Sequence, residues 1–432
     1  MDTPVVLFGA FDRHNLGDLL FPHVAQAMLG DVPVRFAGLA ARDLRGVGGH
    51  RVEAIGELIA GWGDAPARLL HVGGETLTCA AFEAAVMLLD GDALQPTLRH
   101  LDAHPAERDA WTRRMAGCER PLPYVLSKRD WPALRRVVHA GVGGVDLDRL
   151  DDARADALLA RLHEADAVAV RDARTRAALA RHGLAAALMP DPAVLVADLF
   201  GERIARHAAG GEPAALRARF PQGYLAVQCS AVFGDDATLA TLAEALARSA
   251  AASGLGLVLW RAGAAPWHDD MALLRRLAAR LPAGQAQVAA SLYLWDLCAL
   301  IAGSAAVVAS SLHARIVADA FARACVSLQP PAADQRITKL DAWVETWEPE
   351  RRGSVARPRH WHRPSTPRWP GLSATCRQRL RASRPTAAPA TPPCWRHWTD
   401  RAPARRAGGR ARCRAPTDAH PAAPPARRCA PA

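Results

Sequence analysis

Short apolar runs rich in valine and leucine alternate with longer segments of helical periodicity along the first 350 residues. This order is typical of βα units, in which helices cover a parallel sheet. It predicts an α/β fold with parallel sheets. The predicted strands are Val5–Phe8, Val34–Phe36, Leu69–Val72, Val137–His139, Ala167–Val170, Ala187–Met189, Tyr224–Gln228, Leu255–Trp260, Gln287–Ala289, Ala306–Ala309 and Cys325–Leu328. The clearest predicted helices are Ala237–Ala251, Met271–Ala279 and Leu312–Ala322.

This periodicity breaks at Ala208–Pro213, a stretch that contains two glycines and a proline. Because Gly and Pro interrupt regular structure, we place a boundary between domains there. The prediction is an N-terminal Rossmann-like lobe over residues 1–209 and a C-terminal Rossmann-like lobe over residues 214–349, which face each other across a cleft.

Residues 350–432 differ in composition from the rest of the chain. From residue 351 onward there are 19 Arg and 2 Asp, and 14 Pro, whereas residues 1–350 carry a net charge of −6 within a total of +11. A segment without apolar periodicity cannot bury a core, so we predict a disordered basic tail. The composition also fits a shifted reading frame of GC-rich DNA, and we favour this explanation over a genuine basic tail. Since the body is acidic, nucleic acid is not expected as a partner.

The cysteines and the hydropathy pattern bear on the compartment and on metal binding. The nine Cys form no C-x-x-C pair or zinc-like spacing, and no run approaches about 18 apolar residues, the length of a membrane span. No signal-like segment follows Met1. We expect a cytoplasmic protein, with at most peripheral association with the inner face of the membrane, and neither a metal site nor a cofactor.

The first candidate binding segment is Gly9–Asp18, which follows a predicted strand and leads into a helix that begins near Leu16. Free backbone N–H groups at such a turn suit an anionic or hydroxyl-rich ligand. Asn15, Gly17 and Asp18 are the candidate residues. Capping of the helix by Asn15 or Asp18 is an equally good interpretation.

Two further turns at strand ends contain glycine pairs. They are His71–Thr76, with Gly73, Gly74 and Glu75, and Val138–Gly144. Three such turns in one lobe indicate a single ligand-facing edge of the sheet. Because neither turn has the full G-x-G-x-x-G spacing before a helix, a dinucleotide is not the preferred ligand.

Charged residues follow two more strands. Arg171 and Asp172 come after a buried strand, and Arg171 is suited to bind a carboxylate or phosphate with two parallel hydrogen bonds. The alternative is a surface ion pair. Asp191, in the rigid turn Met189–Pro192, is a candidate for the same cleft or a simple turn residue.

In the second lobe, Ser311 and His313 follow a strand at the start of a helix. Ser311 can cap this helix and His313 can face the cleft, although a lone His at a helix start is more often structural. The sequence contains no G-x-S-x-G motif and no cluster of metal ligands, so neither a Ser/His/Asp hydrolase nor a metalloenzyme is indicated.

Six motifs, taken in order, resemble the polysaccharide pyruvyl transferase family over about residues 4–330. They are G-x-x-x-x-x-N-x-G-D at Gly9–Asp18, H-V-G-G-E at His71–Glu75, G-x-G-G at Gly141–Gly144, V-R-D at Val170–Asp172, P-D-P at Pro190–Pro192 and S-L-H-A-R-I at Ser311–Ile316.

The resemblance implies a GT-B-like pair of lobes and transfer of the pyruvyl group of phosphoenolpyruvate onto a sugar diol as a ketal. The expected partners are phosphoenolpyruvate, as donor substrate, and a saccharide or lipid-linked saccharide acceptor. By position, His313 would be the catalytic acid/base and Arg171 would bind the donor. The base stays open among Asp18, Glu75 and Asp191.

The assigned site comprises His313 and Asp18 for catalysis and a larger set for substrate binding. The binding set is Arg171, Asn15, Gly17, Gly73, Gly74, Glu75, Asp191, Ser311 and Arg315. One departure concerns Ser311, which stands where many members of the family have Arg. A donor-binding cation is then missing, and either Arg315 or Arg261 replaces it or the donor differs.

Three other functions remain compatible with the sequence. A nucleotide-sugar glycosyltransferase would use the same two-lobed fold, since fold does not determine function. A degenerate, non-catalytic member of the family would explain the missing Arg and the unusual tail. The third is a nucleic-acid binder that acts through its basic tail, for which affinity would fall steeply with salt.

Overall fold

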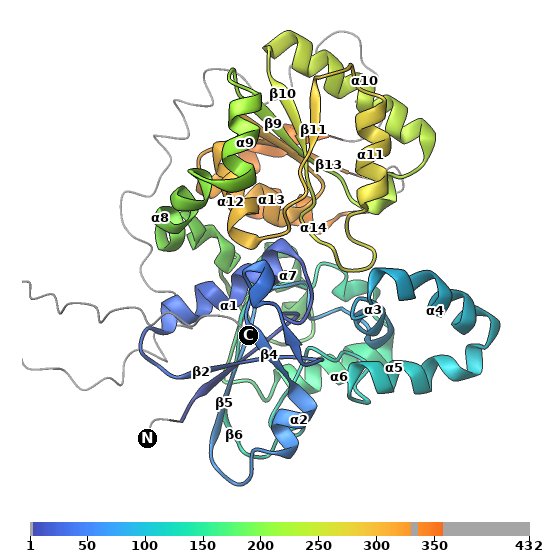
Figure 1. Ribbon diagram of the computed structural model, residues 1–432. Helices are drawn as coiled ribbons and strands as arrows, with labels where there is room; N and C mark the ends of the chain where they lie inside the picture. Colours follow the sequence, from blue (N-terminus) through green and yellow to red (C-terminus); the bar gives the residue numbers. More distant parts are fainter. Residues whose placement is uncertain (1–2, 330–335, 357–432) are drawn as a thin grey trace, which may run out of the picture.

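The computed structural model describes residues 3–329 and 336–356. In this part of the chain two α/β lobes are stacked one above the other (Figure 1). The predicted α/β class with two Rossmann-like, parallel-sheet lobes is confirmed. The predicted tail beyond residue 356 lies outside the described residues.

The N-terminal lobe is built on a sheet that has eight strands among the described residues, in the order β3-β4-β2-β1-β5-β6-β7-β8. Every neighbouring pair is parallel except β3 and β4. The strands are β1 (Val5–Phe8), β2 (Val34–Gly38), β3 (Arg42–Asp43), β4 (Arg51–Ala54), β5 (Ala67–Val72), β6 (Leu134–Val142), β7 (Ala167–Val170) and β8 (Ala187–Leu188). The helices are α1 (Leu16–Leu29), α2 (Ile55–Ala60), α3 (Ala81–Val86), α4 (Gly91–Ala103), α5 (Arg108–Ala116), α6 (Asp152–Leu162) and α7 (Ala173–Arg181).

The C-terminal lobe has a sheet of six strands in the described residues, all parallel, in the order β11-β10-β9-β12-β13-β14. The strands are β9 (Tyr224–Gln228), β10 (Gly256–Leu259), β11 (Ala286–Val288), β12 (Ala306–Ala309), β13 (Ala324–Leu328) and β14 (Val355–Ala356). The helices are α10 (Asp236–Ser253), α11 (Met271–Ala279), α12 (Leu294–Gly303), α13 (Leu312–Ala320) and α14 (Lys339–Trp347). The predicted break near residue 209 falls between α8 (Val196–Ala208) and α9 (Gly211–Arg219), which connect the lobes.

The central strands are short and apolar because both faces of each sheet are covered. All residues of β1, β9 and β12 are buried. A strand buried on both faces has a continuous apolar sequence rather than an alternating one. This explains why these three strands begin and end at the residues that the sequence predicted.

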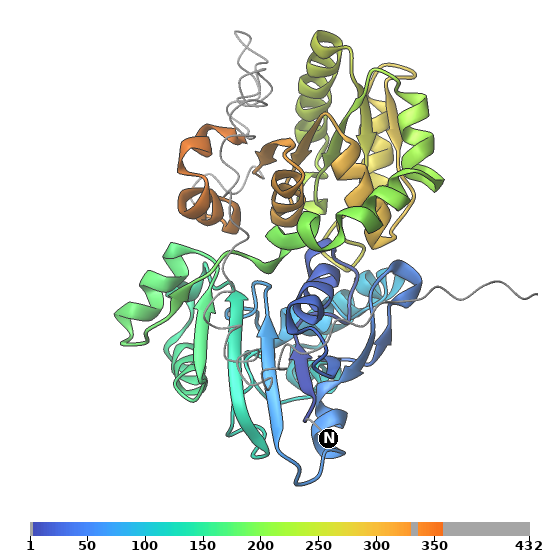
Figure 2. The ribbon, with the colours of Figure 1, turned by 90° about the vertical axis from the view of Figure 1, so that its left-hand side faces the viewer.

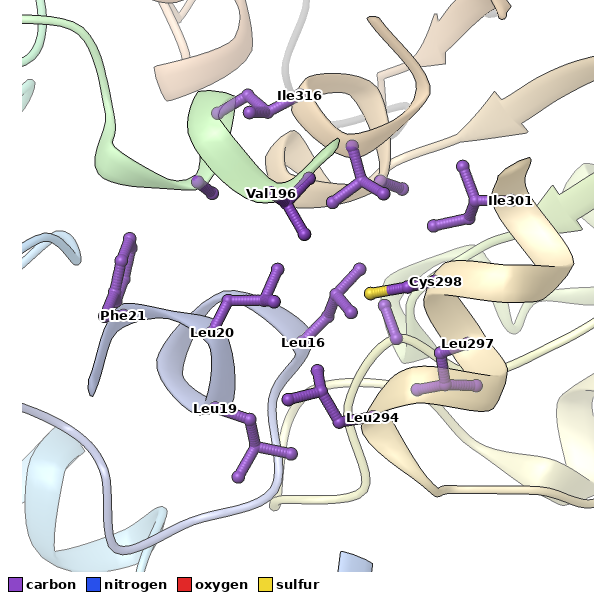
Figure 3. Packing of buried hydrophobic residues seen from close by; sticks show 14 of the residues in the cluster. Leu16, Leu19, Leu20, Phe21, Val196, Leu294, Leu297, Cys298, Ile301 and Ile316 are labelled. Atoms are coloured by element: carbon purple, nitrogen blue, oxygen red, sulfur yellow. The ribbon is translucent and has the colours of Figure 1, made fainter. Parts of the chain in front are cut away.

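A continuous hydrophobic cluster joins the lobes behind the cleft. Figure 3 shows Leu16, Leu20 and Phe21 of α1 facing side chains from α8, α12 and α13. Backbone hydrogen bonds add to this contact, from Leu16 N to Ala262 O (2.7 Å) and from Ala264 N to His14 O (3.0 Å). The segment 9–18 is therefore held by both lobes.

The structure differs from the prediction that residues from 350 onward do not fold. A 3₁₀ segment, Pro349–Ser354, leads into β14, which pairs with β13. Arg351 forms an ion pair with Asp319 at 2.6 Å. β14 is an edge strand of only two residues in an arginine-rich segment, which explains why the sequence did not predict it. Because β14 pairs with β13, the C-terminal lobe extends at least to Ala356.

Helix α14 returns from the C-terminal lobe toward the N-terminal lobe, and its orange ribbon lies above the N-terminal lobe in Figure 2. The indole nitrogen of Trp347 donates to the carbonyl oxygen of Arg171 at 2.7 Å, and the Thr346 hydroxyl accepts from Ala173 N. None of the described helices combines the length and the apolar character that a membrane span needs.

Candidate active site

A cavity of about 640 Å³ lies where the carboxyl ends of the two sheets face each other. This is the expected place for a ligand in open α/β sheets. Of the sequence-predicted residues, seven line the cavity: Asn15, Asp18, Gly74, Glu75, Arg171, Ser311 and His313. The other four, Gly17, Gly73, Asp191 and Arg315, are not among its lining residues.

His313 enters the site from the first turn of α13. The Ser311 hydroxyl caps that helix by accepting from Ala314 N at 3.3 Å. The imidazole is 8% exposed and makes an edge contact with the ring of Phe21 at 5.2 Å. Its Nε2 atom lies 3.4 Å from a carboxylate oxygen of Asp191. A side chain of the C-terminal lobe is thus held mainly by residues of the N-terminal lobe.

Two glycines of the predicted binding set make room for this histidine. A Cβ atom on Gly17 would lie 2.2 Å from Nδ1 of His313. A Cβ atom on Gly73 would lie 2.4 Å from the ring of Phe21, and Gly73 also has φ = +59°, which favours glycine. Neither residue lines the cavity, so their role in this structure is to position His313.

Arg171 is 2% exposed and is bound by two carboxylates. Its guanidinium donates to Glu75 at 2.5 Å and to Asp191 at 3.0 Å. Burial disfavours the charged guanidinium, but these carboxylates outweigh that effect and raise the pKa of Arg171. Burial raises the pKa of Asp191, but the nearby His313 and Arg171 lower it by more. The pKa of Asp191 is therefore lowered overall.

The group formed by Arg171, Glu75 and Asp191 has two carboxylates for one guanidinium. Glu75 also accepts from Val145 N at 2.6 Å, and Asp191 from Ala193 N at 3.0 Å. The carboxylates therefore compete with any anionic ligand for the Arg171 donors. Arg171 is held in place by its neighbours rather than left open to a ligand.

Asp18 is the carboxylate of the predicted set that has no hydrogen bond within residues 3–329 and 336–356. Burial raises its pKa, against the lowering effect of Arg13 and His313. A carboxylate with a raised pKa is suited to accept a proton near neutral pH. Of the three candidates for the base, Asp18 is the one that lines the cavity and forms no hydrogen bond or ion pair with another side chain of the described residues.

Several polar residues were predicted as ligands or caps, and their local bonds are now defined. Asn15 caps α1 by accepting from Gly17 N at 3.0 Å, while still lining the cavity. Asp172 caps α7 by accepting from Thr175 N at 2.7 Å. The Ser311 backbone N–H donates to Gln228 at 2.9 Å. Capping thus accounts for the local contacts of these residues.

Arg315 is placed outside the cavity. It is 1% exposed, and its guanidinium donates to Glu348, Ser327 and Ser354. Its prediction as a substrate-binding residue is not supported by this position, because a buried Arg fully engaged with its own lobe has no donor facing the cleft. Arg261, the other suggested replacement, is also not among the lining residues.

Lys339, Asp269 and Arg13 line the cavity and were not part of the predicted set. Exclusion of solvent, together with the nearby Arg171, lowers the pKa of Lys339. Burial raises the pKa of Asp269 to about 7 although it accepts from Ala262 N and Gln228. One sequence signal could have identified Lys339, since the chain has only two lysines among 54 basic residues.

A group of potential metal ligands lies away from the cleft. His100, His104 and Glu107 each place one ligand atom within 4.8 Å of the others, at the end of α4. All three side chains are exposed, and His100 Nε2 and the Glu107 carboxylate are 3.0 Å apart. A simple surface ion pair accounts for this geometry, so we assign no metal site to it.

Comparison with known proteins relates one part of the chain, which includes Arg171 and His313, to one family. The family model of polysaccharide pyruvyl transferases matches residues 140–330. The resemblance is confirmed over this range, which contains four of the six motifs, including those of Arg171 and His313. The motifs at Gly9–Asp18 and His71–Glu75 lie outside it. A search of curated proteins gave no significant match.

Several solved structures resemble the chain weakly. UDP-GlcNAc 2-epimerase from Methanocaldococcus jannaschii has 10% identity and a TM-score of 0.43, with 76% of this chain and 83% of that chain covered. ADP-heptose LPS heptosyltransferase II from E. coli has 13% identity and a TM-score of 0.37, with coverage of 79% and 89%. Trehalose 6-phosphate synthase from Burkholderia multivorans has 14% identity and a TM-score of 0.38, with coverage of 93% and 97%.

Proposed function

We propose, from the family match over residues 140–330, that this chain transfers the pyruvyl group of phosphoenolpyruvate onto a sugar diol of a cell-surface or exopolysaccharide precursor. The family match supports the broader class, a transferase that modifies saccharides. The observation that carries the specific reaction is that His313, Asp18 and Lys339 line one cavity between the lobes. An acid/base pair and a cation are the groups that this chemistry requires.

The proposed reaction forms a ketal and releases phosphate. The methylene carbon of phosphoenolpyruvate gains a proton, and one sugar hydroxyl attacks the adjacent carbon. The bond from that carbon to the phosphate oxygen then breaks, and phosphate leaves with the electron pair. The second hydroxyl attacks the same carbon and closes the ketal. Of the two hydroxyl protons, one balances the proton added to carbon and the other goes to phosphate.

His313 is the proposed acid that protonates the methylene carbon. Asp191 lies behind it at 3.4 Å, and Phe21 fixes the plane of its ring. A carboxylate within reach of an imidazole nitrogen orients the ring. Asp191 does not line the cavity, so we assign it a positioning role rather than a catalytic one.

Asp18 is the proposed base for the attacking hydroxyl. Its raised pKa follows from burial, and it projects from the first turn of α1, which is held against the C-terminal lobe. The proposed base, Asp18, and the proposed acid, His313, thus come from different lobes. Transfer would therefore depend on the closed arrangement of the two lobes.

Lys339 is the proposed cation for the anionic donor. It stands at the first residue of α14, and its charged neighbours include Arg171, Glu75 and Asp18. The ammonium group could stabilise the carboxylate of phosphoenolpyruvate or the leaving phosphate. The acceptor would be a free or lipid-linked saccharide, and peripheral contact with the inner face of the membrane belongs to the same proposal.

A binding experiment separates this function from the transfer of a nucleotide-linked sugar. Isothermal titration of the full chain would be done with phosphoenolpyruvate and, separately, with a UDP-sugar. We expect saturable binding of phosphoenolpyruvate, lost in Lys339→Met and kept in Lys128→Met. Lys128 is the matched control because it is the other lysine and pairs with Asp166 at the surface. Binding of the UDP-sugar alone would overturn the proposal in favour of a glycosyltransferase.

A further inference from the structure

The cationic side chains of the cavity differ in whether a carboxylate already binds them. Six Arg and Lys residues line the cavity in the described part of the chain: Arg13, Arg149, Arg154, Arg171, Arg336 and Lys339. Arg171 is bound by two carboxylates, Arg149 and Arg336 pair with Asp146, and Arg154 pairs with Asp151. Lys339, the cation proposed above, and Arg13 have no such close pair within the described residues. Arg13 is buried and has only a long contact with Asp12.

The ion pair between Arg13 and Asp12 is weak. The distance from Arg13 Nε to Asp12 Oδ1 is 3.4 Å. The other Asp12 oxygen accepts from Leu39 N at 2.6 Å and from Ala40 N at 3.0 Å. The charge of Asp12 is therefore directed mainly toward the backbone that follows β2. Arg13 itself is only 4% exposed, and its Nη2 atom has no hydrogen-bond partner within the described residues.

Tyr124 completes this local environment. The guanidinium carbon of Arg13 lies 5.3 Å from the centre of the Tyr124 ring, which is the geometry of a cation–π contact. Tyr124 also lines the cavity, and its buried hydroxyl has no hydrogen-bond partner within the described residues. Two buried polar side chains with unmet hydrogen-bonding capacity thus lie together in one wall of the cleft.

A buried guanidinium with unsatisfied donors is unfavourable unless something completes its hydrogen bonding. An anion does so best, because charge-assisted hydrogen bonds to Arg are short and strong. The charge of Arg13 already acts inside the cavity, where it is the strongest influence that opposes the rise in the pKa of Asp18. The donors of Arg13 remain available, whereas those of Arg171 are shared with Glu75 and Asp191.

We propose that Arg13, supported by Tyr124, forms an anion subsite that binds the carboxylate or phosphate of the donor substrate. The identity of that donor as phosphoenolpyruvate rests on the proposed function. The subsite would also supply the cation that is missing at residue 311, where Ser replaces the Arg of many family members. Ser311 offers no charge and caps α13, so the cation comes from the opposite lobe, after β1.

The test compares three variants with the full-length chain by isothermal titration. The variants are Arg13→Met, Arg13→Lys and Tyr124→Phe, with Arg45→Met as the matched control. Arg45 is exposed, pairs with Asp43 and does not line the cavity. Each protein is titrated with phosphoenolpyruvate, inorganic phosphate and pyruvate. Thermal unfolding of each variant without ligand verifies folding.

We expect Arg13→Met to weaken phosphoenolpyruvate binding about tenfold or more, as for a lost charged hydrogen bond. Arg13→Lys should recover part of this loss, and Tyr124→Phe should give a smaller one. If phosphate binding is lost with Arg13 and pyruvate binding is not, the subsite takes the phosphate. The opposite result assigns it the carboxylate.

The outcomes that contradict the subsite are distinct from those that contradict the proposed function. Unchanged affinity for all three anions in both Arg13→Met and Arg13→Lys would overturn the subsite and leave the donor assignment intact. If the unaltered chain binds phosphate through Arg13 but does not bind phosphoenolpyruvate, the subsite stands and the proposed donor is wrong. Binding of none of the three anions overturns the subsite as well.

Discussion

The ring of His313 occupies the space that a side chain at Gly17 would fill, since a Cβ atom there would lie 2.2 Å from Nδ1 of the imidazole. The two residues belong to different lobes and are 296 positions apart in the sequence. The absence of a side chain at residue 17 therefore determines where the proposed acid stands.

Gly17→Ala should disable transfer without unfolding the chain. The added methyl group displaces the His313 ring, and a misplaced catalytic group can cost about a hundredfold in rate. The measurement is kcat, with donor affinity measured in parallel. Gly46→Ala is the control, because a Cβ atom at that exposed position meets no other atom. Full activity in Gly17→Ala would show that the position of His313 is not critical.

Asp18→Asn should remove about a hundredfold or more of the rate, as expected for the loss of a general base. Because burial raises the pKa of Asp18, activity of the unaltered chain should fall as the pH drops through that raised value and the carboxylate gains a proton. The pH–rate profile of Asp18→Asn should lack this acid limb. Asp31→Asn, at an exposed position, should keep it. An unchanged limb in Asp18→Asn would assign the base to another residue.

Truncation should reveal the contribution of residues 351–356 to the C-terminal lobe. A chain ending at Glu350 loses the Ser354 hydroxyl that binds Arg315, the Arg351–Asp319 pair and β14. We expect its free energy of unfolding to be about 1–3 kcal/mol lower than that of a chain ending at Ala356. Urea unfolding of both truncated chains measures this difference. Equal midpoints would mean that the lobe ends where composition alone predicted.

His71 and His139 should make the protein sensitive to acid. Their rings stack at 3.9 Å in the N-terminal core, and burial lowers the pKa of His71 and lowers that of His139 to about 3. Below pH 6.5 the unfolded chain binds protons that the folded chain excludes, so stability falls as the pH falls. The loss is at most about 1.4 kcal/mol per pH unit for each histidine.

The corresponding variant is His139→Phe, which should flatten the fall in unfolding free energy between pH 6.5 and pH 4. His182→Gln, at an exposed position, serves as the control and should leave the pH dependence unchanged. Urea unfolding at several pH values gives the comparison. A slope in His139→Phe equal to that of the unaltered chain would assign the acid sensitivity to other groups.

The sequence was most informative where local patterns determine structure. β1, β7, β9, β12 and α11 begin and end at the predicted residues. Buried strands have continuous apolar sequences, and Asp270 caps α11 with its side chain. β14 was not predicted, because two residues carry no readable pattern and the strand depends on pairing with β13.

The candidate site was predictable in its location but less so in its contacts. The carboxyl ends of parallel strands meet at one edge, so Asp18, Glu75 and Arg171 were expected near one another. The sequence could not tell that Arg171 is already bound by two carboxylates, or that Arg315 points into its own lobe. Those contacts depend on tertiary packing between segments as far as 96 residues apart.

The most direct test of the proposed function follows the pyruvyl group itself. The full chain would be incubated with phosphoenolpyruvate carrying an isotopic label in its carbon atoms, and with a panel of saccharides that offer adjacent or 4,6-related hydroxyl pairs. Mass spectrometry of the saccharides and an assay of free phosphate are read together. We expect a labelled ketal that forms in step with phosphate release, and we expect both to be abolished in His313→Gln. Phosphate release without label in any saccharide, or labelled product at the normal rate in His313→Gln, would contradict the proposed function.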